Sequence, residues 1–280
     1  MDIRGYSTSE KLSGDYREVT LTALTGNKNA MDVIAYPAPQ SVNEALFGDG
    51  VNDHALIGNV AQLNFTNLNP FTVFCFFRTS DSGTNVMFSK QGAANALGWR
   101  LELVGGQIRW HLSGGAAGNR LDVRSTLSIY ADNKWHFIAV TYTGSSNATG
   151  VEMFIDGVQD VGPVINTNNL VSTSASATDA QISGRNGTTT PFPGRLDDVG
   201  CFNIALTPAN AALLLDGFGP GATMADITTH PNLANLVCYY PIDGTIYPNI
   251  LDQGPNSLHA LMVNYAGQDN IIQVVTEVGA

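Results

Sequence analysis

The stretch Gly105-Gly106-Gln107-Ile108-Arg109-Trp110-His111-Leu112 decides the fold class of this chain of 280 residues. Apolar and polar residues alternate in it, with Ile108, Trp110 and Leu112 on one side and Arg109 and His111 on the other. A period of two is that of a β-strand with one side buried and the other facing solvent. The two glycines before it supply the positive φ angles of a tight hairpin turn. The stretch therefore predicts an antiparallel β-hairpin.

Short apolar runs between clusters of Gly, Asn, Asp and Ser continue on both sides of this hairpin. The pattern is typical of antiparallel strands joined by tight loops. Residues 71–77 are apolar almost throughout, as expected for a central strand covered on both sides. Strands are expected at residues 55–58, 71–78, 85–89, 98–104, 107–113, 119–123, 135–142, 151–156, 179–183 and 194–202. The sequence thus predicts an all-β fold in which two antiparallel sheets pack as a sandwich.

One short helix is expected after these strands. Thr207 is a favourable N-cap, and Pro208 suits the first helical position because its missing N–H has no helical partner there. The helix should continue from residue 209 to Leu215 and stop at Gly217.

Composition excludes several classes of function. Hydrophobic residues make up 44% of the chain and charged residues 13%, as in a globular protein. The net charge of -11 opposes binding to nucleic-acid phosphates. No apolar run approaches the roughly 20 residues that cross a bilayer, and the N-terminal stretch lacks the apolar run of a secretory signal. We therefore expect no nucleic-acid or membrane partner, synthesis in the cytoplasm, and buried thiols at Cys75, Cys201 and Cys238.

Three pairs of segments, in order, resemble laminin G-like domains of the concanavalin A-like lectin/glucanase superfamily. They are FGDGVNDH at 47–54 with PFTV at 70–73, WHFIAVTY at 135–142 with VEMFIDG at 151–157, and GRLDDV at 194–199 with ALT at 205–207. The resemblance spans residues 47 to 215 and implies a concanavalin A-like jelly-roll β-sandwich. It also implies that the expected helix is the short helix of that family.

The C-terminal segments LVCYYPIDG at 236–244 and DQGPNSLHA at 252–260 resemble the stretch with which such domains usually begin. A sandwich without that strand would expose an edge and part of its core. We therefore expect residues 237–263 to complete the same sandwich in a circularly permuted order, within one domain of residues 41–280. A truncated second module and an exchange with a neighbouring subunit are the alternatives.

Residues 1–40 read as an extended docking arm. They are polar, with one alternating stretch at 18–24, and the segment GNKNAMDV at 26–33 resembles a stretch near the start of many tailed-bacteriophage virion proteins. This resemblance implies a structural component of a virion, as a capsid decoration or as part of a fibre or tail. We expect such a component to dock on other virion proteins through its arm and to form a homo-oligomer. A trimer is the first hypothesis for its oligomeric state.

Sugar-binding sites pair aromatic rings with amides and charges that bond hydroxyl groups. Candidate ligand-binding residues of this kind are Trp99, Arg109, His111, Arg185 and Asn186. The superfamily resemblance also implies a structural Ca²⁺, with Asp197, Asp243 and Asp252 as candidate ligands. The alternative is that these three aspartates cap turns.

No catalytic constellation is visible. Retaining glycosidases need two carboxylates about 5 Å apart, and the Glu-x-Asp-x-x-Glu strand of the glucanase relatives is absent. Glu152 with Asp156 is the nearest approach, but Asp156 belongs to an Asp-Gly hairpin turn. We therefore predict a non-enzymatic virion protein that binds host surface glycans or other proteins. A cellular carbohydrate-binding or adhesion module is the second hypothesis, and a glycoside hydrolase is the third.

Overall fold

A computed structural model describes residues 8–12, 15–19, 44–93, 95–217, 222–243, 247–265 and 271–273. The chain divides into two compact units, residues 1–40 and 41–280. In the first unit, β1 (Thr8–Leu12) and β2 (Asp15–Val19) form an antiparallel hairpin. Most of the alternating stretch at residues 18–24 and all of the segment 26–33 lie outside the described residues.

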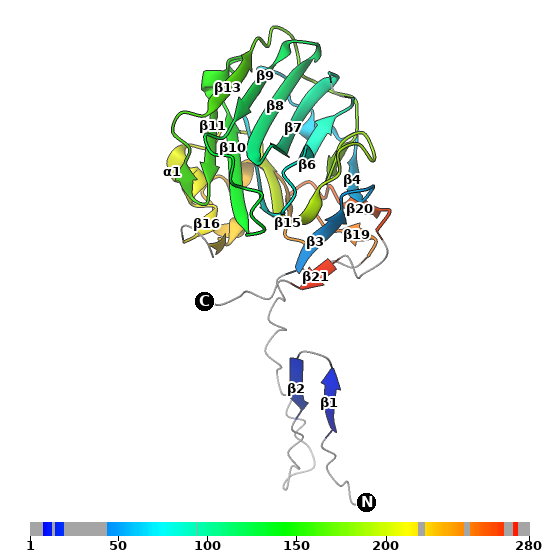
Figure 1. The fold of residues 1–280 in the computed structure, drawn as a ribbon. Helices are drawn as coiled ribbons and strands as arrows, with labels where there is room; N and C mark the ends of the chain where they lie inside the picture. Colours follow the sequence, from blue (N-terminus) through cyan, green and yellow to red (C-terminus); the bar gives the residue numbers. More distant parts are fainter. Residues whose placement is uncertain are drawn as a thin grey trace, which may run out of the picture. The chain divides into compact units, whose positions relative to one another are not determined.

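The second unit is a sandwich of two antiparallel sheets (Figure 1). The eight-stranded sheet has β5 and β15 at its centre, and β18 pairs with one half of β15. Its order is β12 (Val158–Gln159), β11 (Val151–Ile155), β10 (His136–Tyr142), β5 (Phe71–Arg78), β15 (Pro193–Phe202), β3 (Glu44–Asp49) and β21 (Ile271–Gln273), with β18 (Leu236–Tyr240) as the eighth strand.

The nine-stranded sheet contains the hairpin of β7 and β8 that was recognised from the alternating sequence. Its order is β13 (Val164–Asn168), β9 (Asn119–Arg124), β8 (Gln107–Ala116), β7 (Leu97–Val104), β6 (Asn85–Gln91), β14 (Ala180–Ile182), β4 (His54–Gly58), β20 (Ala260–Val263) and β19 (Asn249–Ile250). No helix of the described residues has the length and apolar character needed to cross a membrane.

Aromatic rings fill the space between the two sheets. Phe71 of β5 packs against Trp110 of β8 with ring centroids 5.3 Å apart, and against Trp99 of β7 at 5.9 Å. The alternate residues of β5, such as Phe74, face a second apolar cluster on the other side of the eight-stranded sheet. The apolar run at 71–77 is therefore a central strand covered on both sides, as its composition predicted.

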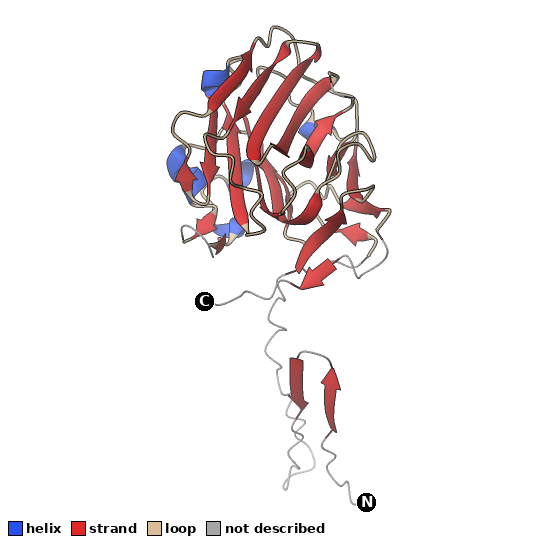
Figure 2. Ribbon diagram, in the orientation of Figure 1, coloured by secondary structure: helices blue, strands red, loops and turns tan. Residues whose placement is uncertain are grey.

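The second cluster also contains residues of short elements that follow β15, and Figure 2 shows these elements as short helices and strands. These are α1 (Pro208–Ala212), β16 (Leu215–Asp216), β17 (Thr223–Met224), and the 3₁₀ turns at Ile227–Thr229 and Leu233–Asn235. Thr207 caps α1 and accepts a hydrogen bond from the backbone N–H of Asn210, as expected. The helix is shorter than predicted, because Leu215 instead pairs with Met224 in a two-stranded ribbon.

All ten strands expected from the sequence are present, and the all-β sandwich is confirmed. The edge strand β13 was missed because its residues are mostly exposed and show no alternation of burial. The described residues contain three free cysteines, Cys75, Cys201 and Cys238, and all three are buried.

The C-terminal segments pair within both sheets. Strand β18 pairs with residues 199–202 of β15, beside β3, which pairs with residues 193–196 of the same strand. Strand β20 pairs with β4 of the other sheet. The assignment of residues 41–280 to one permuted domain stays a prediction, and these pairings supply a test of it.

We expect deletion of residues 236–280 to abolish cooperative unfolding. All five residues of β18 are buried, and burial stabilises by about 1.5–3 kcal/mol for each large apolar side chain. The total is comparable with the roughly 5–15 kcal/mol by which a domain is stable. Thermal melting followed by circular dichroism checks this, with deletion of residues 1–40 as the control. A sharp transition in the chain shortened to residues 1–235 would contradict it.

Candidate functional site

The polar side of the nine-stranded sheet carries two of the predicted ligand-binding residues. Because the apolar residues of β7 and β8 face the core, Arg100, Glu102, Arg109 and His111 lie on the opposite side. Arg109 forms ion pairs with Glu102 at 3.0 Å and with Asp122 of β9 at 2.6 Å. The face is therefore a network of charges and not a solvated row of independent side chains.

Arg185 joins this network from the loop after β14. It is 8% exposed and donates a hydrogen bond from Nη1 to the carbonyl of Gly92 at 3.0 Å. Burial lowers the pKa of the His111 imidazole well below its usual value, and the positive charges of Arg100, Arg109, Arg120 and Arg185 lower it further. His111 is therefore neutral at pH 7. The structure thus brings Arg109, His111 and Arg185 together, while the neighbouring Asn186 is exposed.

Trp99 is a core residue and not a ligand contact. Its side chain is 1% exposed, and its indole Nε1 donates to the carbonyl of Leu63 at 3.0 Å. The rings of Phe88 and Trp110 pack against it with centroids 5.0 and 6.2 Å away. The core encloses the indole, so it offers no face to a sugar. Strand alternation places Trp99 inside because Arg100 is on the polar side.

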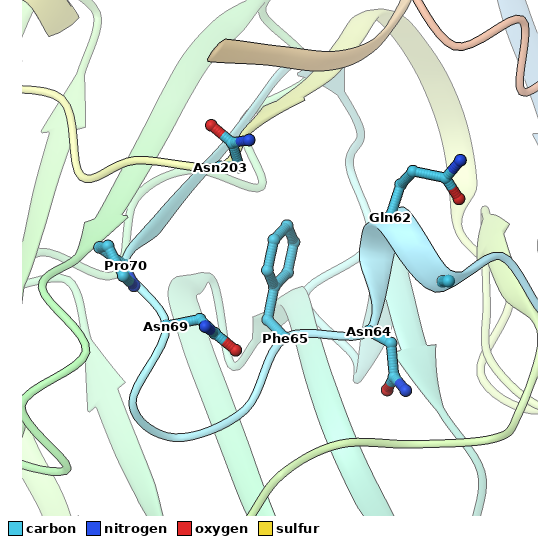
Figure 3. Close-up of a pocket in the computed structure, with 7 residues that line it drawn as sticks. Gln62, Asn64, Phe65, Asn69, Pro70 and Asn203 are labelled. Carbon is cyan, nitrogen blue, oxygen red and sulfur yellow. The ribbon is translucent and has the colours of Figure 1, made fainter.

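A separate pocket lies at the end of the strands where the 61–70 segment meets the end of β15. It has a volume of about 320 Å³ and no charged lining residue. It is lined by Ala61, Gln62, Asn64, Phe65, Asn69, Pro70 and Asn203. Figure 3 shows the ring of Phe65 standing between Asn69 and Gln62, with Asn203 from the other segment beyond it. The pocket thus combines one aromatic ring with four side-chain amides.

Three of these amides are oriented by hydrogen bonds to their oxygens. Asn64 Oδ1 accepts from the N–H of Ser176 at 2.6 Å, Asn69 Oδ1 accepts from the N–H of Thr66 at 2.8 Å, and Asn203 Oδ1 accepts from an amide at 3.0 Å. Their amide nitrogens have no acceptor among the described residues. The pocket therefore presents N–H donors with fixed orientation, together with the exposed Gln62.

The predicted calcium ligands do not form one set. Asp252 instead caps its own turn: its carboxylate accepts from the N–H groups of Tyr239, Gly254 and Leu258 at 2.7–2.8 Å. Throughout the described part of the chain, no group of three or more His, Cys, Asp or Glu residues is placed to hold a metal ion. Turn capping thus occupies the Asp252 oxygens, and a calcium site at Asp197, Asp243 and Asp252 stays a prediction from the sequence.

Asp197 and Asp243 lie near each other and near Asp198, to which the Tyr239 hydroxyl donates a hydrogen bond. Burial raises the pKa of Asp197 well above its usual value, and the negative charges of Asp198 and Asp243 add to this shift. Burial likewise raises the pKa of Asp198 to about 7. The three carboxyl groups therefore destabilise one another when ionised.

Glu152 and Asp156 do not form a glycosidase pair. Asp156 accepts from the N–H of Phe137 at 2.8 Å and bonds Nδ1 of His136 at 2.8 Å, so it closes the turn after β11. Glu152 lies within β11, where its carboxylate accepts a hydrogen bond from Gln159 Nε2 at 3.4 Å, whereas Asp156 lies in the turn with a φ of 51°.

Sequence reasoning missed two groups of residues. Arg100, Glu102, Arg120 and Asp122 could have been found from alternation, because each is next to an apolar residue of an expected strand. The pocket residues Gln62, Asn64, Asn69 and Asn203 lie in loops with no periodic signal, and only the folded chain brings them together.

The unit of residues 41–280 is thus a β-sandwich with charged residues on the outer side of one sheet and an amide-lined pocket in its loops. Residues 49–212 match the model of the family Laminin_G_3, described as the concanavalin A-like lectin/glucanases superfamily. The match covers more than half of the chain, so the chain belongs to this superfamily. None of the curated proteins matches the chain.

Several solved structures resemble the sandwich. Mouse laminin α1 chain domains LG4-5 are 17% identical over 57% of this chain and 41% of theirs, with a TM-score of 0.42. A putative carbohydrate-binding protein from Bacteroides ovatus is 16% identical over 80% and 59%, with a TM-score of 0.49. The CBM40 domain of Ruminococcus gnavus IT-sialidase, bound to α2,3-sialyllactose, is 13% identical over 61% and 97%, with a TM-score of 0.45. The chain thus spans less than two-thirds of the first two relatives, and the likeness concerns the fold.

Changing Asp198→Asn should flatten the dependence of stability on pH. A carboxyl group whose pKa rises from 3.8 to about 7 on folding stabilises the protein below pH 3.8, and that stability is lost as the pH rises to about 7. The variant should therefore melt at least about 2–4 °C above the wild type at pH 8 and near the wild type at pH 4. Asn also tolerates the positive φ of 48° at this position.

Calorimetric melting from pH 4 to pH 8 checks this expectation. The control is Asp216→Asn, which changes an exposed carboxylate of β16. An equal shift at both pH values would contradict the explanation by burial.

Changing Asp252→Asn should lower the free energy of unfolding by about 1–3 kcal/mol, because an amide nitrogen would face backbone N–H donors. The loss should be the same in excess EDTA and in excess Ca²⁺, as measured by thermal melting. A wild-type melting temperature that rises with Ca²⁺, and a variant that does not respond, would restore Asp252 as a metal ligand.

Proposed function

We propose that this protein is a non-catalytic, carbohydrate-binding component of a bacteriophage particle. The observation that carries the carbohydrate-binding part is the amide-lined pocket of Figure 3. The pocket lies in loops at the end of a rigid sandwich, which is where binding residues are concentrated in such folds. Its volume of about 320 Å³ is at the small end of known ligand sites.

The chemistry of the pocket fits a neutral saccharide. Its lining holds no charged side chain, so it offers nothing that would balance an ionic ligand. Amide groups bond hydroxyls, and the Phe65 ring, which is 6% exposed, adds an apolar edge to the lining. Phe65 stacks on Phe71 at 4.2 Å, so the core holds this ring in place before a ligand arrives. Such preorganisation lowers the entropy lost on binding.

The absence of catalysis is proposed on the separation and use of the carboxylates. Asp156 is engaged with His136 and a backbone N–H, and Glu152 lies on an exposed strand surface near Gln159. The second carboxylate near Asp156 is that of Asp132, which contacts Nε2 of His136 at 3.1 Å, so the imidazole stands between the two acids. A binding function needs no such pair.

The particle location is proposed on the resemblance of residues 26–33 to the start of tailed-phage virion proteins. In this proposal the unit of residues 1–40 docks on other virion proteins, and the unit of residues 41–280 binds host surface glycans. Trimeric assembly belongs to the same proposal, because fibres and capsid decorations commonly have threefold symmetry.

Loss of single pocket donors should weaken glycan binding. We expect Gln62→Ala and Asn203→Asp each to lower the affinity for the neutral glycan that an array identifies by roughly 3- to 10-fold, which is the contribution of one hydrogen bond. Asn203→Asp keeps the acceptor for Asn235 while removing the donor to the ligand. Gln159→Ala is the control, because it removes an exposed amide from an edge strand.

The same preparation should release no reducing sugar from a panel of polysaccharides. Release that disappears in Glu152→Ala or Asp156→Ala would overturn the non-catalytic proposal. An array with no bound neutral glycan would overturn the pocket as the site.

The particle proposal is tested by mass spectrometry of purified phage particles from the producing cells. The protein should copurify with particles at a constant ratio to the capsid protein. Its recovery in the cell-envelope fraction instead would favour the cellular adhesion module.

A further inference from the structure

Five of the nine arginines of the chain lie on the polar face of the nine-stranded sheet. They are Arg100 of β7, Arg109 of β8, Arg120 and Arg124 of β9, and Arg185 of the following loop. The whole chain has a net charge of -11, so this concentration of positive charge is local. The chemistry of this face therefore differs from that of the amide-lined pocket.

Strand register brings these side chains together. Arg100 is the cross-strand neighbour of His111, and His111 is that of Asp122. In the next position along the strands, Glu102 lies opposite Arg109, and Arg109 lies opposite Arg124. Side chains at such positions lie about 4.5–5.5 Å apart at Cβ, which places the charged groups in one continuous cluster around His111.

Two carboxylates do not balance five guanidinium groups. Glu102 pairs with Arg100 at 2.8 Å and Arg109 at 3.0 Å. Asp122 pairs with Arg109 at 2.6 Å and Arg124 at 3.3 Å. Arg120 and Arg185 have no carboxylate at ion-pair distance in the described part of the chain, and a guanidinium group does not lose its charge in a protein.

Buried polar atoms near these two arginines also lack partners. The Nδ1 of His111 makes no hydrogen bond although this residue is 1% exposed. The Nε atoms of Arg120 and Arg185 are likewise buried without a partner. Leaving such groups unpaired costs free energy, so their arrangement is explained if a ligand supplies the acceptors.

We propose that the polar face around His111 binds the anionic group of an acidic saccharide, with Arg120 and Arg185 as its principal contacts. That the ligand is a saccharide rests on the proposed lectin-like function; that it is anionic rests on the uncompensated arginines. Guanidinium groups match the planar oxygens of a carboxylate and also bond sulfate. The neutral His111 ring adds its unpartnered Nδ1 for a neighbouring hydroxyl group.

Solvent reaches the face through its outer arginines. The side chain of Arg109 is 13% exposed and that of Arg124 is 24% exposed. A ligand therefore meets guanidinium groups at the surface, and the excess of positive charge attracts an anion to a chain that otherwise repels it.

The test is calorimetric titration of the full chain at about 0.15 M salt. The carboxylate probe is an oligogalacturonate, with its fully methyl-esterified form as the uncharged counterpart. The sulfate probe is dextran sulfate, with dextran as its counterpart. Binding of an acidic probe without binding of its counterpart is expected, and the probe that binds identifies carboxylate or sulfate as the group.

We expect Arg120→Ala and Arg185→Ala each to lower the affinity for that probe about 10- to 100-fold, as for the loss of a charge-assisted hydrogen bond. Arg120→Lys should bind with intermediate affinity, because it keeps the positive charge and loses the bidentate geometry of the guanidinium group. The matched control is Arg78→Ala, which removes one guanidinium from the eight-stranded sheet. Arg120→Ala should melt like the wild type, because the buried Nε of Arg120 has no hydrogen-bond partner within the described chain.

Three results would overturn the inference. The first is that no acidic probe binds to the wild type, and the second is that the uncharged counterparts bind equally well. The third is that Arg120→Ala, Arg185→Ala and the control Arg78→Ala all lower the affinity by the same factor. The last would show general electrostatic attraction. Failure of the neutral-glycan proposal is a separate outcome, because Gln62→Ala and Asn203→Asp affect the pocket and leave the arginine face intact. Acidic-probe binding retained in these two variants would support the inference on its own.

Discussion

The contacts of the Phe71 ring hold this structure together. Phe71 starts the central strand β5 and packs against Trp99 and Trp110 of the facing sheet, Tyr142 of the neighbouring strand and Phe65 of the preceding loop. Ring pairs at such distances add about 0.5–1.5 kcal/mol beyond the burial of their area. One residue thus joins both sheets and one loop. The positions of the amide-lined pocket and of the arginine-rich sheet face depend on it.

The amide-lined pocket depends on this contact directly. Phe65 is fixed against Phe71, and the amides of Asn64 and Asn69 flank it along the same segment.

The arginine face depends on the Phe71 contacts through the alternation of side chains along the strands. Because Trp99 and Trp110 must face Phe71, their neighbours Arg100 and His111 are placed on the outer side of the nine-stranded sheet. Core packing therefore decides which polar residues are available to a ligand.

The buried polar residues fall into two kinds. Asp252 has its oxygens fully occupied by backbone N–H groups, and Asp156 is occupied by His136 and Phe137. Groups satisfied in this way stabilise turns and have little left to offer a ligand. His111 and Arg120, in contrast, have buried nitrogens without partners. The difference between satisfied and unsatisfied groups separates structural residues from candidate binding residues more clearly than residue type does.

The sequence by itself determined the ten expected strands, the hairpin turns, the family and, where the pattern alternates, the side of a strand that faces the core. These are local properties, because strand geometry gives neighbouring residues opposite directions and Gly supplies the turn angles. Alternation therefore placed Arg109 and His111 outside. Trp99 and Arg100 are consecutive residues of one strand. Assigning Arg100 to the outer side would therefore have placed Trp99 inside.

Only the tertiary structure decided which of these outer residues meet. Strand register joins Arg100, His111 and Asp122 across three strands, and a loop adds Arg185 from far along the chain. The pocket likewise unites Gln62 with Asn203, which share no periodic pattern. Contacts of this kind depend on pairing and packing between segments that are far apart in the sequence. The pattern within one segment does not specify its register against a distant strand.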